Sequence, residues 1–270
     1  MKTMTAALLM SLALVPAVRA QRQVAVATTP GATVAAVPFG PGEKLIYEVN
    51  AGWLGKRGNA WSEVTGVENV RGRQAYQLSF RLKGGMLGLN LDDKQASWLD
   101  VGDLYSHRFF QDLNQPRYKR IRTIDFYPSE GLWRQRKCLP DAGCEPEKTG
   151  DLASNIPLDD VSFLYWARTV PLEVGQTYTF TRYFKDEGNP VVIRVLRRER
   201  VTVPAGTFNT IVVKPIIKTD GLFSEGGEAE LYFSDDARRI VVLMKTSMPV
   251  IGRMEMKLQS YVPGTPLEAR

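Results

Sequence analysis

The sole histidine, His107, is the first residue in this 270-residue chain that could do chemistry. A histidine acts as the general base of a serine hydrolase when a serine and an acid lie beside it. The sequence has no Gly-x-Ser-x-Gly run of the kind that presents a nucleophilic serine. Nothing places His107 beside a particular serine, and a metal site would need further ligands. We therefore predict no catalytic residue, no metal and no cofactor.

Three pairs of adjacent aspartates are the second candidate, because two carboxylates facing one cleft hydrolyse glycosidic bonds. They are Asp92-Asp93, Asp159-Asp160 and Asp235-Asp236. Adjacent residues of a strand point to opposite faces, and two of the pairs stand where a turn or a helix start favours Asp. We therefore expect turn and cap roles for these aspartates.

Cys138 and Cys144 are the only cysteines, and five residues separate them. In a chain that leaves the reducing cytoplasm, such a pair predicts a disulfide. A loop this short restricts the unfolded chain little, so we expect a contribution on the order of 2 kcal/mol at best.

The N-terminus has the pattern of a secretory signal peptide. Met1-Lys2 precedes an apolar run, Ala6 to Val15, and then Val18-Arg19-Ala20, where a signal peptidase would read. We predict a signal peptide at 1–20, cleaved after Ala20, and hence a periplasmic or secreted protein. An uncleaved anchor is the alternative, but about ten apolar residues fall short of the ~20 that span a bilayer. No later stretch is predicted to span a membrane as a helix.

The charge of the chain is modestly basic. Cleavage removes Lys2 and Arg19 and no acid, which lowers the net charge from +6 to +4. Outside the cytoplasm this gives no reason to expect nucleic acid as a partner. The densest basic runs are Arg117 to Arg122 and Arg194 to Arg200, which we expect on the outward, solvated face of strands. Attraction to anionic lipid or lipopolysaccharide phosphate is the alternative interpretation.

Most of the chain alternates apolar and polar residues with a period of two, between turns rich in Gly, Pro and Asp. Helical spacing is persuasive only between Pro157 and Pro171, with Asp159 or Asp160 as a cap. The sequence therefore predicts an all-β fold with one short helix: an antiparallel, strongly curved sheet or a partly open β-barrel. Two stacked sandwiches are the alternative topology.

We expect one β-rich domain over residues 39–262. A flexible tether at 21–38 precedes it, and a short tail at 263–270 follows it. The Cys loop and the polar stretch up to Asn155 are expected to interrupt the sheet.

Three predicted loop tips carry large apolar side chains, which we call the candidate apolar rim: Trp53, Leu54, Met86, Leu87, Leu222 and Phe223. One interpretation is that these tips fold inward and cap the core. The other is that they share one rim and guard an apolar cavity or touch a membrane surface, because large exposed apolar groups mark binding sites.

Four segments resemble the exported bacterial domain of unknown function DUF3108. They are Gly42 to Tyr47, Thr169 to Gly175, Val203 to Phe208 and Phe233 to Arg239, in the order of that family. The resemblance implies an extracytoplasmic, β-rich protein and carries over no catalytic motif. The cysteine pair is not part of it.

These observations leave three hypotheses for the function. The first is a non-catalytic envelope protein that binds a lipid, another amphiphile or an envelope partner. The second is a structural or assembly factor that pairs an exposed strand edge with another envelope protein. The third is a hydrolase acting on polysaccharide, which requires paired carboxylates in one cleft.

Overall fold

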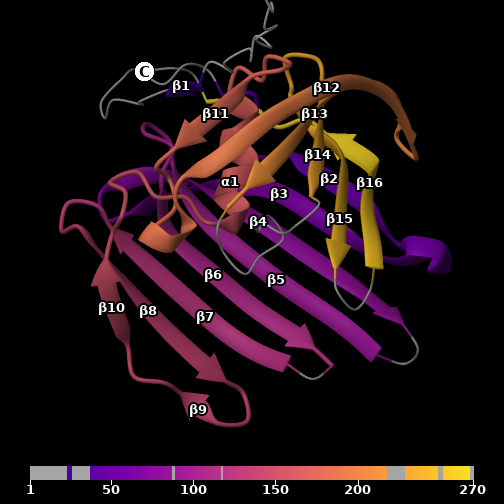
Figure 1. Ribbon diagram of the computed structural model, residues 1–270. Helices are drawn as coiled ribbons and strands as arrows, with labels where there is room; N and C mark the ends of the chain where they lie inside the picture. The colour runs from indigo at the N-terminus through magenta and orange to yellow at the C-terminus, as the bar shows by residue number, and fades with distance from the viewer. Residues whose placement is uncertain are drawn as a thin grey trace, which may run out of the picture.

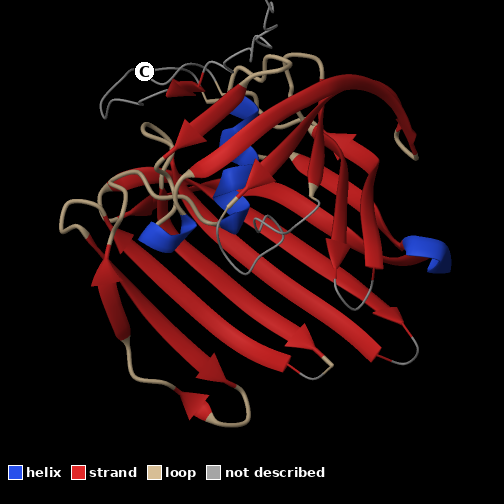
Figure 2. Ribbon diagram, viewed as in Figure 1, coloured by secondary structure: helices blue, strands red, loops and turns tan. Residues whose placement is uncertain are grey.

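The computed structural model describes residues 23–25, 37–86, 89–116, 118–217, 229–248 and 252–267, and strands dominate it (Figure 2). The helical elements are η1 (Gly52–Leu54), α1 (Asp160–Trp166), η2 (Ala167–Thr169) and η3 (Asp186–Gly188). The strands are β1 (Gln23–Ala25), β2 (Lys44–Ala51), β3 (Lys56–Val70), β4 (Arg73–Met86), β5 (Leu89–Asp100), β6 (Ser106–Gln115), β7 (Tyr118–Tyr127), β8 (Leu132–Leu139), β9 (Gly143–Cys144), β10 (Lys148–Asp151), β11 (Thr177–Phe180), β12 (Val191–Val203), β13 (Gly206–Ile216), β14 (Glu230–Ser234), β15 (Val241–Met248) and β16 (Gly252–Val262).

All these strands belong to one sheet. Their order is β1-β11-β12-β13-β14-β15-β16-β2-β3-β4-β5-β6-β7-β8-β10, with β9 paired to β8. Neighbours are antiparallel except β1 and β11, which run parallel. The described end strands, β1 and β10, do not pair with each other, so the sheet is open. The predicted curved antiparallel sheet with one short helix is thus confirmed, and stacked sandwiches are not formed.

The sheet curls around helix α1 (Figure 1). Strands β3–β8 form a broad wall, and β12–β16 fold over in front of it, with β2 and β16 joining the two parts. Helix α1 lies between them and contacts β4 and β5. The sheet therefore has a concave face, which holds α1, and a convex face.

Period-two alternation builds the core on the concave face. On β2 every second residue is buried, from Leu45 to Ala51, and the residues between are half-buried. On β7 Ile124 and Phe126, two positions apart, both have 0 % of their surface exposed. Burying one apolar side chain stabilises the folded state by roughly 1.5–3 kcal/mol. The apolar side chains that alternate on the concave face therefore stabilise the fold.

A tight turn joins the two long strands β12 and β13. Val203 pairs with Gly206, and Pro204-Ala205 form the turn. Gly206 has a φ of +126°, which L side chains rarely adopt, so glycine is required there. The segment Val203 to Phe208 therefore forms a hairpin turn within the sheet.

Two expectations about the connections change. The polar stretch after Cys138 does not interrupt the sheet, because β10 lies within it and pairs antiparallel with β8. Within the predicted tether, Gln23–Ala25 pairs with β11. The predicted signal peptide lies outside the described residues. The longest helix in the described part of the chain, α1, has seven residues, so none of the helices there could span a bilayer.

Candidate functional site

Helix α1 is fixed to the concave face by its first turn. The Asp159 carboxylate accepts hydrogen bonds from the backbone N–H groups of Val161 and Ser162, both at 2.9 Å, and the Asp159 N–H donates to the Ser162 hydroxyl at 2.9 Å. This reciprocal arrangement is a capping box. The Ser97 hydroxyl on β5 also donates to Asp159 at 2.6 Å, and the hydroxyls of Ser106 and Ser162 share a hydrogen bond of 2.7 Å. The helix start and the sheet therefore form one unit.

The buried carboxyl of Asp159 holds its proton more tightly than an exposed aspartate does. Burial raises the pKa of Asp159 to about 6, although hydrogen bonds from Ser162 and Ser97 favour its ionised form. The predicted cap is confirmed. Oδ1 of Asp159 makes both capping bonds and Oδ2 accepts from Ser97, so both carboxylate oxygens are occupied.

A small cavity lies between α1 and the concave face. Its volume is about 30 Å³ and it is partly open to solvent, which gives room for about two water molecules. The lining is mainly apolar and comes from α1, η2, β2, β3, β4, β15 and β16: Leu45, Tyr47, Ser62, Phe80, Leu164, Tyr165, Arg168, Val241, Met244 and Met256. A larger guest would need Leu164 and the two methionines to move, and methionine adapts its shape readily.

Arg168, which lines this cavity, belongs to a buried ion pair. Arg168 donates to the two carboxylate oxygens of Glu43 at 2.6 and 2.9 Å, and to the carbonyl oxygens of Pro38 and Arg238. Both charged side chains are at most 3 % exposed. Burial acts to lower the pKa of Arg168, but the hydrogen bonds and attraction of Glu43 outweigh it and raise that pKa. The pair joins the residue before β2, the helical turn η2 after α1 and the turn before β15, and no local pattern in the sequence indicated it.

The two tyrosines of the cavity are also engaged. The Tyr47 hydroxyl donates to the carbonyl oxygen of Val241 at 3.0 Å, and the hydroxyls of Ser62 and Tyr165 share a bond of 3.0 Å. Burial raises the pKa of both phenols. Both therefore stay neutral, and neither is suited to act as a base.

Beyond α1 the concave face carries two arginines of β7, Arg120 and Arg122. They share a face with Ile124 and Phe126 because all four stand at alternate positions of one strand. Both arginines are half-buried. The expectation that this basic run points outward is therefore wrong for these two residues. Ile124 and Phe126 must face the core, and residues at alternate positions of the same strand face the same way.

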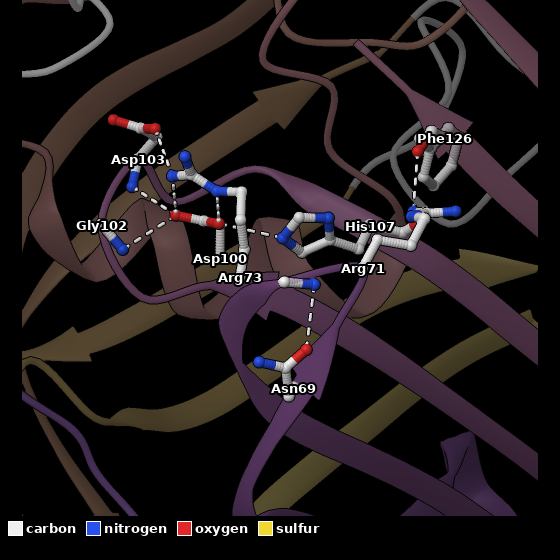
Figure 3. Close-up of polar contacts among 9 residues, drawn as sticks. Asn69, Arg71, Arg73, Asp100, Gly102, Asp103, His107 and Phe126 are labelled. Atoms are coloured by element: carbon white, nitrogen blue, oxygen red, sulfur yellow. Dashed lines mark hydrogen bonds and ion pairs between the residues drawn. The ribbon is translucent and has the colours of Figure 1, made fainter. Parts of the chain in front are cut away.

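A polar cluster around Asp100 contains the only histidine (Figure 3). Asp100 accepts hydrogen bonds from Arg73 at 2.6 and 2.8 Å, from the backbone N–H groups of Gly102 and Asp103, and from His107 Nε2 at 2.9 Å. Burial opposes ionisation of Asp100, but the bonds from Arg73 and His107 outweigh it and lower its pKa well below the usual range. The cluster fastens the turn between β5 and β6.

The Asp100–His107 pair resembles two members of a catalytic triad, but its surroundings do not suit one. His107 is 3 % exposed, and its ring lies against Tyr105 with centroids 4.6 Å apart. The described residues contain no group of three side chains able to hold a metal ion. The pair is therefore closed to solvent and lies beside the turn between β5 and β6.

The other aspartate pairs have separate partners. Asp92 accepts two hydrogen bonds from Arg81, whereas Asp93 accepts from Asn114 N–H and Gln115. Their side chains leave opposite faces of β5, as expected. Asp235 pairs with Arg198, and Asp236 accepts from Ser234 and Arg238 within the turn that follows β14.

The predicted disulfide is present between Cys138 and Cys144, which are paired residues of β8 and β9. It closes a hairpin at the edge of the sheet, away from α1 (Figure 1).

The candidate apolar rim stays a prediction. Leu54 lies in η1 and is half-buried. Leu87, Leu222 and Phe223, and the side chains of Trp53 and Met86, lie outside the described residues.

Comparisons with known proteins give a family and distant structural relatives. A family model described as "Protein of unknown function (DUF3108)" matches residues 46–259. No curated protein matches the chain.

Three solved structures are similar at low identity. One is a beta-barrel-like protein of a domain of unknown function, DUF1849, from Brucella abortus, with a TM-score of 0.48 and 12% identity, covering 85% of this chain and 99% of that one. A proposed lipoprotein from Parabacteroides distasonis has a TM-score of 0.39 and 12% identity, covering 85% and 100%. A proposed exported protein with a YmcC-like fold from Bacteroides fragilis has a TM-score of 0.36 and 9% identity, covering 84% and 100%.

Proposed function

The chain belongs to the DUF3108 family, whose description assigns no activity, and we propose that it is a non-catalytic envelope protein that binds an amphiphilic ligand. The ligand lies on the concave face of the open sheet. The observation that carries this proposal is the partly open, mainly apolar cavity between α1 and the sheet. The adaptable side chains of Leu164, Met244 and Met256 let an apolar chain enter there.

Two features support a location outside the cytoplasm. The N-terminal residues have the pattern of a signal peptide. The only two cysteines form a disulfide, and such bonds persist in oxidising compartments.

The other two functions have less support. The β10 edge is four residues long and carries Lys148 and Asp151, both exposed, and short charged edges are how natural sheets avoid pairing with other chains. For the hydrolase, the capping oxygens of Asp159 are occupied, and each of the other two aspartate pairs already has partners.

Native mass spectrometry tests the proposal. The mature protein is incubated with a bacterial envelope lipid extract, alongside a Leu164→Trp variant that fills the cavity. The matched control is Leu196→Trp, because Leu196 is 37 % exposed on β12. We expect an adduct of lipid mass on the wild type and the control, and its loss in Leu164→Trp. If all three proteins show only the mass of the free protein, or if Leu164→Trp keeps the adduct, the proposal is wrong.

A further inference from the structure

Arg120 and Arg122 differ from most arginines of this sheet in lacking a carboxylate partner. Arg73, Arg81 and Arg197, for example, each form an ion pair of 3.0 Å or less. Within the described part of the chain, no carboxylate lies within 4.0 Å of either β7 arginine. The Asp160 carboxylate at the start of α1 attracts both of them from beyond that distance, and a half-buried cation without a close counter-ion is costly.

Their neighbours satisfy the two guanidinium groups incompletely. Arg120 donates to the side-chain oxygen of Gln111, and Arg122 lies over the ring of Phe109, 5.6 Å from its centroid. The Nε atoms of both arginines are buried and have no acceptor among the described residues. Leaving a buried donor unpaired costs about 1–3 kcal/mol, and more for a charged group. Both guanidinium groups therefore have N–H donors without an acceptor among the described residues.

The local charge is positive. Lys137 of β8 pairs with Arg122 in the sheet register, although its ammonium group is already bonded to Glu145 at 2.6 Å. Burial lowers the pKa of Arg122, the charge of Arg120 lowers it further, and Asp160 at the start of α1 opposes both. Two guanidinium groups that repel each other are stabilised by an anion placed between them, and their planar forks suit the two oxygens of a phosphate or carboxylate.

The arginines are also connected to the cavity by the register of the sheet. Arg122 lies opposite Gln111, Gln111 opposite Gln95, and Gln95 opposite Phe80, which lines the cavity. Three steps between neighbouring strands measure about 14 Å. An amphiphile of ordinary length therefore reaches from the arginines to the cavity along one row of concave side chains.

We propose that Arg120 and Arg122 bind the anionic group, a phosphate or a carboxylate, of the amphiphile that occupies the concave face. The ligand is then an anionic lipid rather than a neutral one. This inference rests on the proposed function, which by itself leaves the charge of the ligand open.

The test compares two lipids that differ by one phosphate. The mature protein is titrated by calorimetry, below the micelle concentration, with 1-oleoyl lysophosphatidic acid, with 1-monoolein and with inorganic phosphate. We expect the phospholipid to bind at least about tenfold more tightly than monoolein, which corresponds to about 1.4 kcal/mol. The variant Arg120→Gln/Arg122→Gln should lose this difference and keep its affinity for monoolein.

The control variant is Arg134→Gln/Arg136→Gln. It removes the same charge from two exposed residues of the neighbouring strand β8, at the alternate positions that face away from Lys137. It should retain the preference for the phospholipid. If it loses the preference equally, long-range charge explains the effect and the inference is wrong.

The remaining outcomes separate the two proposals. Equal affinity of the wild type for both lipids would contradict the inference and leave the proposed function standing. Binding of neither lipid would contradict both. Arginine-dependent binding of inorganic phosphate without lipid binding would replace the lipid by a free anion and overturn both proposals as stated.

A stability measurement separates a binding role from a structural one. Burial disfavours the charge of Arg122, which has only the Phe109 ring and the more distant Asp160 to offset that cost, so Arg122→Met should melt at an equal or higher temperature than the wild type. A lower melting temperature would assign Arg122 to the fold and contradict the inference, even if the glutamine variant fails to fold.

Discussion

Replacing Glu43 by glutamine removes the one carboxylate within ion-pair distance of Arg168 in the described residues, while keeping the shape of the side chain. Both side chains are buried, so the remaining guanidinium cannot recover its loss from water. Breaking a buried ion pair by removing one partner costs about 3–5 kcal/mol. For a domain of this size each kcal/mol lowers the melting temperature by about 2–4 °C, so we expect a fall of about 6–20 °C.

Thermal and urea unfolding of Glu43→Gln measure this cost. The control is Glu63→Gln, because Glu63 pairs with Lys44 at 2.8 Å while their side chains are 29 and 42 % exposed. An exposed pair contributes about 0–1 kcal/mol. Combining Glu43→Gln with Arg168→Met should recover part of the loss, because both charges are then gone. Equal stability of Glu43→Gln and Glu63→Gln would refute this reasoning.

Three further changes test the framework of the site. Asp159→Asn keeps the helix cap but removes an acid whose folded pKa of about 6 exceeds the ordinary 3.8. The folded state holds that proton more tightly, so wild-type stability should fall by up to about 3 kcal/mol as the pH rises from 4 to 6, and urea titrations of the variant should lack this fall. Asp100→Asn should cost about 1–3 kcal/mol and speed amide exchange at Gly102 and Asp103, without changing lipid affinity; unchanged exchange would contradict the role given to the cluster. Cys138→Ser/Cys144→Ser should cost about 2 kcal/mol or less by thermal unfolding and leave lipid binding intact; loss of the fold would contradict this local role.

The alternation of apolar and polar residues predicted the fold well, because the apolar positions of each strand identify the face that the strand buries. On β7, counting back from Phe126 in steps of two also reaches Ile124, Arg122 and Arg120, so the inward direction of both arginines was available. The basic composition of that run suggested a solvated face instead. Counting in steps of two from the buried apolar residues of a strand predicts side-chain direction better than the local composition does.

The polar partners could not be predicted in the same way. Glu43 and Arg168 are 125 residues apart, and no local pattern connects them. His107 meets Asp100 across a turn, after a shift of register between Trp98 and Leu99 that moves the pairing by one residue. Such a shift has no distinct sequence signature here. Sequence therefore indicated which residues lie inside, and the structure was needed to show which ones touch.

The central claim, that an amphiphile occupies the concave face, is tested most directly by nuclear magnetic resonance with a spin-labelled fatty acid. The methyl groups of Met244 and Met256 line the cavity and can be labelled with carbon-13. We predict that the spin label broadens these two methyl signals at stoichiometric ligand and leaves the amide signals of the exposed Arg134 and Arg136 unchanged. Methyl signals that stay sharp, or broadening shared equally by all these positions, would contradict the account.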